Sequence, residues 1–282
     1  MAVRIGIVAS GGGARDVVDL AVAAEEHGWD GFFGWDGVDI GPRDTFDPWG
    51  LLSAAAVRTE RVVLGAMVFV PARRRPWVLA RQALTVDHLS QGRLVLPVGL
   101  GVGDDRGFAA VRGEAGTPRE RAELLDEALA VLDLAFGGDR FEHHGTHHDV
   151  DGMQLRPLPV QRPRPPVWVV GAWPSRRSLA RAARWDGVVT QGLRTEDELD
   201  VGALTELVAT VRALRAEAGL PLDGYEVVLQ GVLPADPAAA AHHLAALADA
   251  GATWWVESAW DEERSTVDAL RARIRRGPAH AG

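Results

Sequence analysis

Short apolar runs alternate with stretches of helical spacing along the whole chain. The runs are rich in β-branched residues, and the one from Val62 to Val68 is apolar at nearly every position. A continuous apolar run indicates a strand buried on both faces, as in a parallel sheet covered by helices. The runs expected to form strands are Val3–Ala9, Gly31–Trp35, Val62–Val68, Leu94–Gly99, Val167–Val170, Gly187–Thr190, Glu226–Leu233 and Thr253–Glu257.

The stretches between these runs carry helix signals. From Val17 to Ala24, apolar residues recur at i, i+3, i+4 and i+7, which places them on one helical face. Asp47, Thr117 and Asp236 each precede a proline, an arrangement typical of a helix start. The chain therefore alternates strands with helices from one end to the other.

About eight strand–helix units fit in the chain, and eight is the number that closes a barrel. We expect an α/β fold, a single (β/α)8 TIM barrel in which residues 1–282 form one domain. The alternative is an open, doubly wound sheet that binds a dinucleotide, but its fingerprint is incomplete: Asp16 and Asp104 stand where a third small residue belongs. The repeat count favours the barrel.

One stretch interrupts the alternation. Phe141–Pro166 is rich in proline and longer than an ordinary connection between a helix and a strand. We therefore expect an insertion at about residues 137–166, between the fourth helix and the fifth strand. It would lie over the barrel surface or over its mouth.

Composition narrows the class of protein. The net charge of −9 has the wrong sign for non-specific binding to nucleic acid. With no cysteine, the chain has no disulfide, thiolate metal site or cysteine nucleophile. A membrane span needs a run of about 18 apolar residues, and the sequence contains none. The first ten residues lack the pattern of a signal peptide. We expect a cytoplasmic protein that binds neither nucleic acid nor membrane.

In a barrel of this kind the active site lies at the carboxyl ends of the strands. Gly99–Gly103 would let a flat ligand approach the backbone, and Gly171–Ser175 would offer backbone N–H groups to an anion. Both also fit ordinary turns or caps. Asp36 is the carboxylate expected deepest in the mouth, where it would accept a hydrogen bond or assist a proton transfer. It could instead cap a turn.

Four histidines, His143, His144, His147 and His148, raise the hypothesis of a metal-dependent barrel hydrolase. The segment has an extended pattern, and on a strand i and i+4 side chains lie about 13 Å apart, too far to share one metal. We therefore expect no metal site.

Several motifs follow one another in an order that resembles the bacterial luciferase-like monooxygenase family. They cover most of Val3–Val189 and weaken beyond it; each is weak alone, but the series is specific. The matching segments are Arg61-Val62-Val63-Leu64-Gly65, Arg75-Pro76, Ala80-Arg81-Gln82-Ala83, Asp87-His88-Leu89-Ser90-Gln91-Gly92-Arg93, Gly99-Leu100-Gly101, Arg119 to Glu127, His144-Gly145, Pro157-x-Pro159-x-Gln161, Pro165 to Gly171, and Asp186-Gly187.

The resemblance implies a barrel that binds FMN or the deazaflavin coenzyme F-420 at its mouth. It implies a cis peptide between Met67 and Val68 beside the tricyclic ring, and a position for Asp36 near the pyrimidine edge. The residues that the resemblance assigns to the ring are Gly99, Leu100 and Gly101. The residues that it assigns to the phosphate are Gly171, Ala172, Trp173 and Ser175.

This chain also departs from its relatives. Gly37 stands where many have a histidine for acid–base work, and Val102 where deazaflavin-dependent relatives often have glutamate. Asp36, Asp104 and Asp105 remain the candidate acids, with Asp36 the one we nominate as catalytic.

The sequence thus predicts a flavin- or deazaflavin-dependent oxidoreductase, a monooxygenase or a hydride-transfer enzyme, that acts on a small organic substrate. The resemblance allows a separate reductase as partner and a homodimer as assembly. The alternative is a non-catalytic flavin-binding protein of the same fold.

Overall fold

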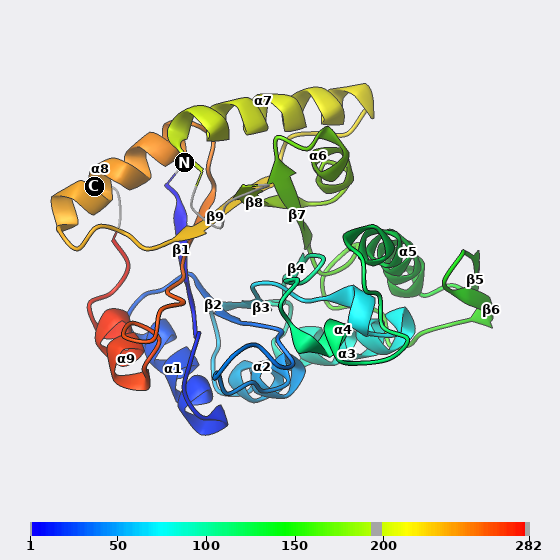
Figure 1. The fold of residues 1–282 in the computed structure, drawn as a ribbon, viewed down its shortest axis with the longest axis horizontal. Helices are drawn as coiled ribbons and strands as arrows, with labels where there is room; N and C mark the ends of the chain where they lie inside the picture. Colours follow the sequence, from blue (N-terminus) through cyan, green and yellow to red (C-terminus); the bar gives the residue numbers. More distant parts are fainter. Residues whose placement is uncertain (1, 193–198, 280–282) are drawn as a thin grey trace.

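Eight parallel strands form a ring, with helices outside it (Figure 1). The computed structural model describes residues 2–192 and 199–279. The hydrogen-bonded order of the strands is β3-β2-β1-β10-β9-β8-β7-β4. Their bounds are β1 Arg4–Val8, β2 Gly31–Gly34, β3 Val63–Ala66, β4 Leu96–Val98, β7 Val167–Trp173, β8 Gly187–Gly192, β9 Glu226–Gly231 and β10 Trp254–Glu257. Each expected strand is present.

The ring closes between β3 and β4, the two ends of that order. Leu64 forms a parallel bridge with Leu94, and Phe69 forms one with Val98. The N–H of Phe69 donates to the carbonyl of Pro97 at 2.8 Å, just beyond the end of β3. With β4 bonded to β3 on one side and β7 on the other, the predicted eight-stranded barrel is confirmed.

The helices begin where the capping signals place them. Asp47, Thr117 and Asp236 accept hydrogen bonds from backbone N–H groups in the first turns of α2, α5 and α8. The α-helices are α1 Ala14–Glu26, α2 Pro48–Ala56, α3 Pro76–Leu89, α4 Arg106–Ala109, α5 Pro118–Gly137, α6 Arg176–Ala182, α7 Val201–Glu217, α8 Pro237–Asp249 and α9 Val267–Arg275, and a 3-10 turn spans Pro71–Arg73. None of the helices in the described ranges is both long and apolar enough to cross a membrane.

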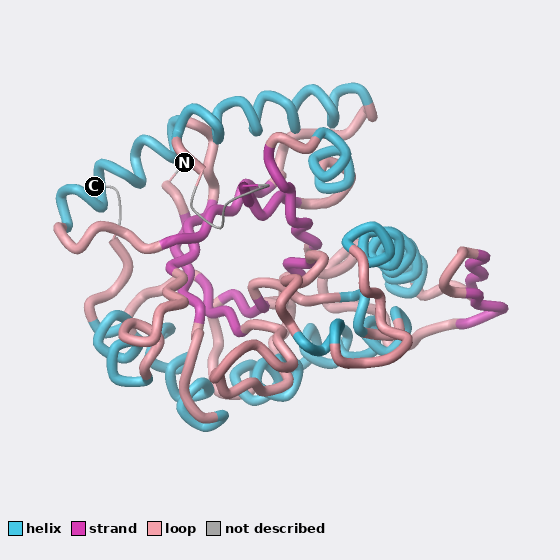
Figure 2. The backbone as a smooth tube through the Cα atoms, viewed as in Figure 1, coloured by secondary structure: helices cyan, strands magenta, loops and turns pink. Residues whose placement is uncertain are grey.

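Two apolar cores hold these layers together. One lies between the strands and the helices, and the other fills the ring that Figure 2 shows end-on. Large aromatic rings dominate the inner core. The ring centroids of Trp168 and Trp254 lie 5.5 Å apart, and that of Phe33 lies 6.2 Å from each of them. Gly31 leaves the room that they need, since a Cβ there would lie 2.7 Å from the Phe33 ring. These rings therefore fill the middle of the barrel.

An antiparallel hairpin, β5 Phe141–His144 and β6 Asp149–Met153, lies between α5 and β7. It falls in the stretch expected to form the insertion. Figure 1 shows it projecting beyond α5, away from the ring. The carboxylate of Glu127 on α5 accepts N–H groups of its turn, and Trp77 of α3 contacts His148. The hairpin thus packs on the outer surface.

Candidate functional site at the carboxyl ends of the strands

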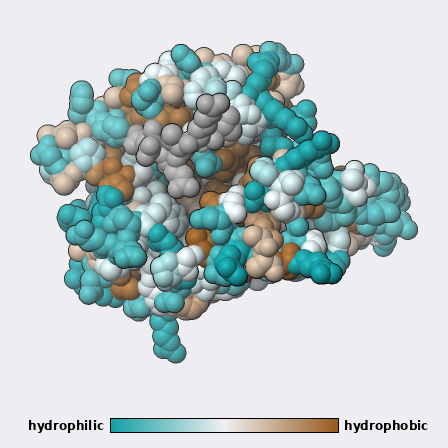
Figure 3. Space-filling view, in the orientation of Figure 1, coloured by the Kyte–Doolittle hydropathy of each residue, from teal (hydrophilic) through white to brown (hydrophobic). Residues whose placement is uncertain are grey.

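The two glycine tracts lie side by side at one end of the ring, which we call the mouth. Strands β4 and β7 pair in parallel, with Val98 opposite Val169. Gly99 follows Val98 directly, and Gly171 lies two residues after Val169 in the last part of β7, so both tracts lie at the carboxyl end of the sheet. Figure 3 shows a hollow with hydrophobic surface near the middle of this face, beside the grey atoms.

Gly99 lies at the floor of this site and is closely packed against side chains of the inner ring. A Cβ added to Gly99 would lie 2.9 Å from Val68 and 3.0 Å from Val170, both on the inner side of the ring. The Met67–Val68 peptide beside it is cis, as the family resemblance implies. Leu100 and Gly101 continue the tract and are half-buried. Glycine at position 99 thus permits the close approach of Val68 and Val170, which form an apolar floor for the site.

The inner wall of the mouth is more polar than the barrel below it. Side chains alternate along a strand, so the residue two positions beyond a member of the inner core also faces inward. Ser10, Gln191, Gln230 and Ser258 occupy such positions after Val8, Val189, Val228 and Val256. The Ser10 hydroxyl is buried and has no hydrogen-bond partner among the described residues. The mouth therefore offers uncharged hydrogen-bonding groups to a ligand.

Asp36 lies at the mouth, but its carboxylate is already occupied. It accepts hydrogen bonds from the N–H of Val70 at 2.9 Å and from both terminal nitrogens of Arg74, and Arg73 lies 3.6 Å away. Its side chain is 3% exposed. This environment suits a residue that fixes the loop after β3. The catalytic role of Asp36 stays a prediction.

Asp105 joins the ends of β2 and β4. Its carboxylate accepts N–H groups of Val38, Asp39 and Gly107 and forms an ion pair with Arg73. Burial raises the pKa of Asp105, but the backbone hydrogen bonds and the Arg73 charge outweigh it, so the pKa lies below its ordinary value. Asp105 is therefore an ionised structural anchor, whereas Asp104 is exposed.

In the segment Gly171–Ser175, the residues up to Trp173 end β7, and Pro174 and Ser175 connect this strand to α6. Gly171 packs against Val188 and Leu179, and the hydroxyl of Ser175 accepts the N–H of Ser178 as the helix cap. The N–H of Ala172 donates to the Ser178 hydroxyl. Trp173 is half-buried against the outer core. The phosphate-binding role of these residues stays a prediction.

Two further aromatic residues meet at the rim. Trp35 follows β2 and Trp260 follows β10, and their rings make an edge-to-face contact at 5.8 Å. Arg43 lies over Trp260 and donates to its carbonyl. The pair forms an apolar wall beside the mouth.

The histidines lie on the hairpin, away from the mouth. His144 pairs with Asp149 at 2.7 Å. In residues 2–192 and 199–279, no three His, Asp or Glu side chains are arranged to hold a metal ion. A cavity of about 320 Å³ lies at the opposite end of the ring, where Arg4, Trp168, Glu226 and Trp254 are among its lining residues. Neither feature adjoins the glycine tracts.

Sequence reasoning missed three arginines near the mouth: Arg73, Arg74 and Arg121. The first two follow β3 in a run of arginines and hold Asp36 and Asp105. Arg121 lies in the first turn of α5 and is 6% exposed. The signal was present, because Arg121 precedes Leu125 and Leu129 at helical spacing on the buried face.

A parallel barrel with a glycine-lined mouth defines the class of TIM-barrel proteins that bind a ligand at the carboxyl ends of their strands. The luciferase-like monooxygenase family model matches residues 2–281. The chain therefore belongs to the luciferase-like monooxygenase family, a family of flavin- or F-420-dependent oxidoreductases.

Individual relatives agree with this membership. The chain is 31% identical over 226 residues to an F-420-dependent glucose-6-phosphate dehydrogenase of Nakamurella multipartita, covering 77% of this chain and 63% of the relative. It is 28% identical over 225 residues to the enzyme of the same name from Microbacterium testaceum, again covering 77% and 63%. The chain thus spans less than two thirds of these curated relatives.

Solved structures share the fold. An F-420-dependent secondary alcohol dehydrogenase in complex with an F-420–acetone adduct superposes with a TM-score of 0.79 at 17% identity, covering 98% of this chain and 100% of that one. The oxygenating constituent of 3,6-diketocamphane monooxygenase from Pseudomonas putida, in complex with FMN, gives 0.76 at 16% identity, covering 96% of each. At these identities the likeness concerns the fold alone.

Proposed function

We propose that this protein is an oxidoreductase that binds F-420 at the barrel mouth and transfers a hydride to or from a small organic substrate. The observation that carries the proposal is the apolar floor of the mouth, where Gly99 packs against Val68 beside Met67, in a chain that matches the family model over nearly its whole length. F-420 is the first candidate because the curated relatives compared above use it. FMN is the second, supported by the FMN-bound diketocamphane enzyme of the same fold.

The residues present fit such a cofactor. Gly99, Leu100 and Gly101 would flank its ring on one side, with Met67 and Val68 beside them. Gly171, Ala172, Trp173 and Ser175 would hold its phosphate. The cofactor supplies the hydride or, for FMN, the oxygen chemistry, and the barrel positions it and excludes water.

The chain's own groups define the rest of the reaction. Val68 and Val170 keep the inner side of the site apolar, whereas Ser10, Gln191, Gln230 and Ser258 present hydrogen-bonding groups across it. These uncharged groups would orient a hydroxyl or carbonyl of the substrate. Asp36 holds Arg74 and the Val70 N–H, so in this proposal it positions the loop after β3. A reductase partner, a homodimeric assembly and a cytoplasmic location remain predictions from the sequence.

Reconstitution tests the cofactor assignment. The purified chain is mixed separately with F-420 and with FMN, unbound cofactor is removed by gel filtration, and absorbance reports what is retained. We expect retention of F-420. Retention of FMN alone would move the assignment to the second candidate, and retention of neither would refute the proposal.

A glycine variant tests the position of the ring. Gly99→Val places branched carbons where Val68 and Val170 already crowd a single Cβ, so we expect at least a tenfold loss of cofactor affinity. Gly103→Ala is the matched control, because nothing lies within 4 Å of a Cβ there. A cofactor that binds equally to both variants would place the ring elsewhere.

Turnover by the loaded protein over a panel of alcohols and ketones distinguishes an enzyme from a non-catalytic binding protein.

A further inference from the structure

The cavity of about 320 Å³ lies at the amino end of the barrel, opposite the mouth. Its lining includes the first residues of β1, β9 and β10, which are Arg4, Glu226 and Trp254, together with Trp168 near the start of β7. Ligand pockets in proteins span about 300–1,000 Å³, so this cavity has room for one small molecule. The proposed function makes no use of this end of the barrel.

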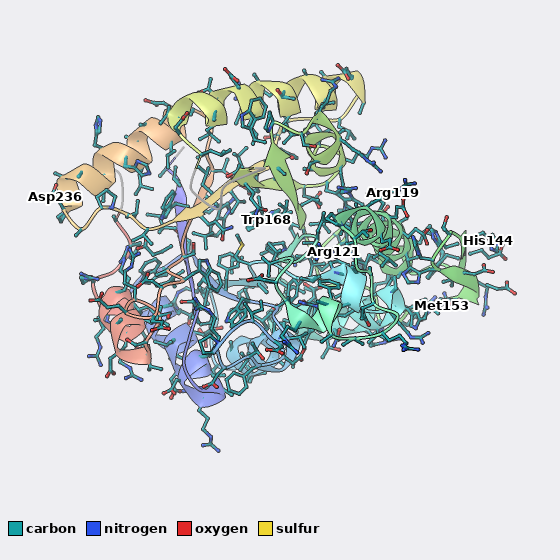
Figure 4. The ribbon with its side chains drawn as sticks, viewed as in Figure 1. Arg119, Arg121, His144, Met153, Trp168 and Asp236 are labelled. Carbon is teal, nitrogen blue, oxygen red and sulfur yellow. The ribbon has the colours of Figure 1, made fainter. Side chains whose placement is uncertain are left out.

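Two buried tryptophans of the lining have unused hydrogen-bond donors. Trp168 is 2% exposed and Trp254 is 1% exposed, and the Nε1 of each has no partner in the part of the chain that the structure describes. Figure 4 shows Trp168 inside the ring of strands. An indole N–H can only donate, and a buried donor without an acceptor costs free energy. These two residues therefore favour a ligand that supplies acceptor atoms.

The neighbouring glycines indicate where the two donors point. A Cβ added to Gly187 would lie 2.7 Å from Cδ1 of Trp168 and 2.9 Å from Cβ of Glu226. The edge of Trp168 that carries Nε1 is therefore next to a residue of the cavity lining. A Cβ added to Gly31 would lie 2.9 Å from Cζ3 of Trp254. Because Cζ3 and Nε1 lie on opposite edges of an indole, the Nε1 of Trp254 faces away from Gly31, which is not part of the lining.

The walls of the cavity carry a surplus of positive charge. Arg4 pairs with Glu226, and Arg164 pairs with Asp186. Two more guanidinium groups have no carboxylate in direct contact among the described residues. One donates to backbone carbonyls and a hydroxyl, and the other is exposed and has no hydrogen bond there. The charged residues of the lining are Arg4, Arg93, Arg162, Arg164, Asp186 and Glu226.

We propose that this cavity is a second binding site, for a small molecule that carries an oxyanion, either a phosphate or a carboxylate. Its oxygens accept the indole N–H groups of Trp168 and Trp254, and the exposed Arg162 attracts its charge. Hydrogen bonds to a charged acceptor are roughly twice as strong as those to a neutral one, which favours an anion over a neutral carbonyl. The site is separate from the mouth and does not depend on the proposed function.

Indole signals in a two-dimensional ¹⁵N–¹H NMR spectrum test the site directly. The chain has ten tryptophans, so each contributes one indole signal, and Trp168→Phe and Trp254→Phe identify two of them by their loss. The wild type is titrated with sodium phosphate and with sodium acetate, against sodium chloride at the same ionic strength. We expect saturable shifts of both signals with phosphate or with acetate, and the anion that causes them identifies the group. Chloride should cause no saturable shift.

Two variants change the charge of the cavity in opposite directions. Arg162→Met should weaken anion binding about threefold, as for the loss of an exposed ion pair. Glu226→Gln removes a negative charge and frees Arg4, so it should strengthen binding by a similar factor. Arg212→Met is the matched control, because Arg212 is exposed on α7 and lies outside the cavity lining. It should bind the anion like the wild type.

Melting temperature gives a second measurement that needs neither tryptophan variant. An anion that binds the folded chain raises the melting temperature. Glu226→Gln should enlarge this increase and Arg162→Met should reduce it, each compared with Arg212→Met.

Three results would overturn the proposal. Shifts confined to the indole signals of Trp35, Trp173 and Trp260 would place the anion at the mouth. Signals of Trp168 and Trp254 that neither anion moves would show that their donors bind solvent alone. Binding that Arg162→Met and Glu226→Gln leave unchanged would place the anion outside this cavity. Because the titrations contain no cofactor, failure to retain F-420 or FMN would leave these results unaffected.

Discussion

Asp105 shows how a single residue couples two loops at the mouth. Three backbone N–H groups and Arg73 hold its carboxylate, and its pKa lies below the ordinary value. A group whose folded pKa is depressed stabilises the fold above its unfolded pKa, about 3.9 for aspartate, and loses this effect as the pH falls through the folded pKa.

We therefore expect Asp105→Asn to lower the free energy of unfolding by about 3 kcal/mol at pH 7, since it removes a buried ion-pair partner. The deficit relative to wild type should shrink as the pH falls below about 4, where the carboxylate of the unfolded chain becomes protonated first and that of the folded chain only at lower pH. Urea unfolding across pH measures both quantities. Asp104→Asn, at the exposed neighbour, should behave like wild type; equal effects of the two substitutions would contradict this assignment.

At the residue scale, the sequence predicted backbone features better than charged ones. The glycine tracts were found because glycine marks a turn and apolar runs mark the strand ends before them. Arg121 was missed because its burial with few hydrogen bonds appears only in the folded chain. Contacts between different elements cannot be predicted from one segment of the sequence. Its place on the apolar face of α5 was the available clue.

At the scale of elements, the eight barrel strands were predictable because both of their faces are buried. The hairpin β5–β6 was expected only as an irregular, partly extended insertion. Its outer strand carries polar residues such as Glu142 and His144, so the apolar pattern of a buried strand is absent. Its position is set by a side chain from another element, Glu127.

The Glu127 carboxylate accepts N–H groups of Thr146, His147 and His148. Burial raises its pKa, but these backbone bonds outweigh it, so the pKa is lowered and the carboxylate is ionised at pH 7. Glu127→Gln weakens these charge-assisted bonds, and we expect about 1 kcal/mol of destabilisation confined to the hairpin.

Hydrogen exchange measures this effect residue by residue. The variant should exchange faster over residues 141–153, while the barrel strands keep their protection. Glu142→Gln, at an exposed hairpin position, is the control and should leave exchange unchanged. Faster exchange throughout the ring would show that the hairpin supports the barrel itself.

At the scale of the whole molecule, closure of the ring depends on the junction between β3 and β4, which the repeat count implies but does not locate. Arg93 lies at this junction, just before β4. Its guanidinium donates to the carbonyls of Ala56, Thr59 and Val62 at 2.8–3.0 Å. It thereby ties the end of α2 and the start of β3 to β4. Burial lowers the pKa of Arg93, although nearby Glu25 and Glu60 oppose this.

Replacing Arg93 leaves three carbonyls without their donor at the seam of the barrel. We expect Arg93→Met to lower the free energy of unfolding by about 2–4 kcal/mol, in proportion to the bonds lost. Arg58→Met is the control from the same corner, since Arg58 forms an exposed ion pair with Asp19 of the kind that contributes about 0–1 kcal/mol.

Chemical unfolding followed by tryptophan fluorescence measures both variants. Because inner-core side chains come from strands all round the barrel, loosening one seam should weaken the barrel as a unit: the unfolding transition should move to lower denaturant concentration and stay single. A separate early transition would mean that the strands beside the seam unfold independently, and that the ring is less cooperative than its continuous inner core implies.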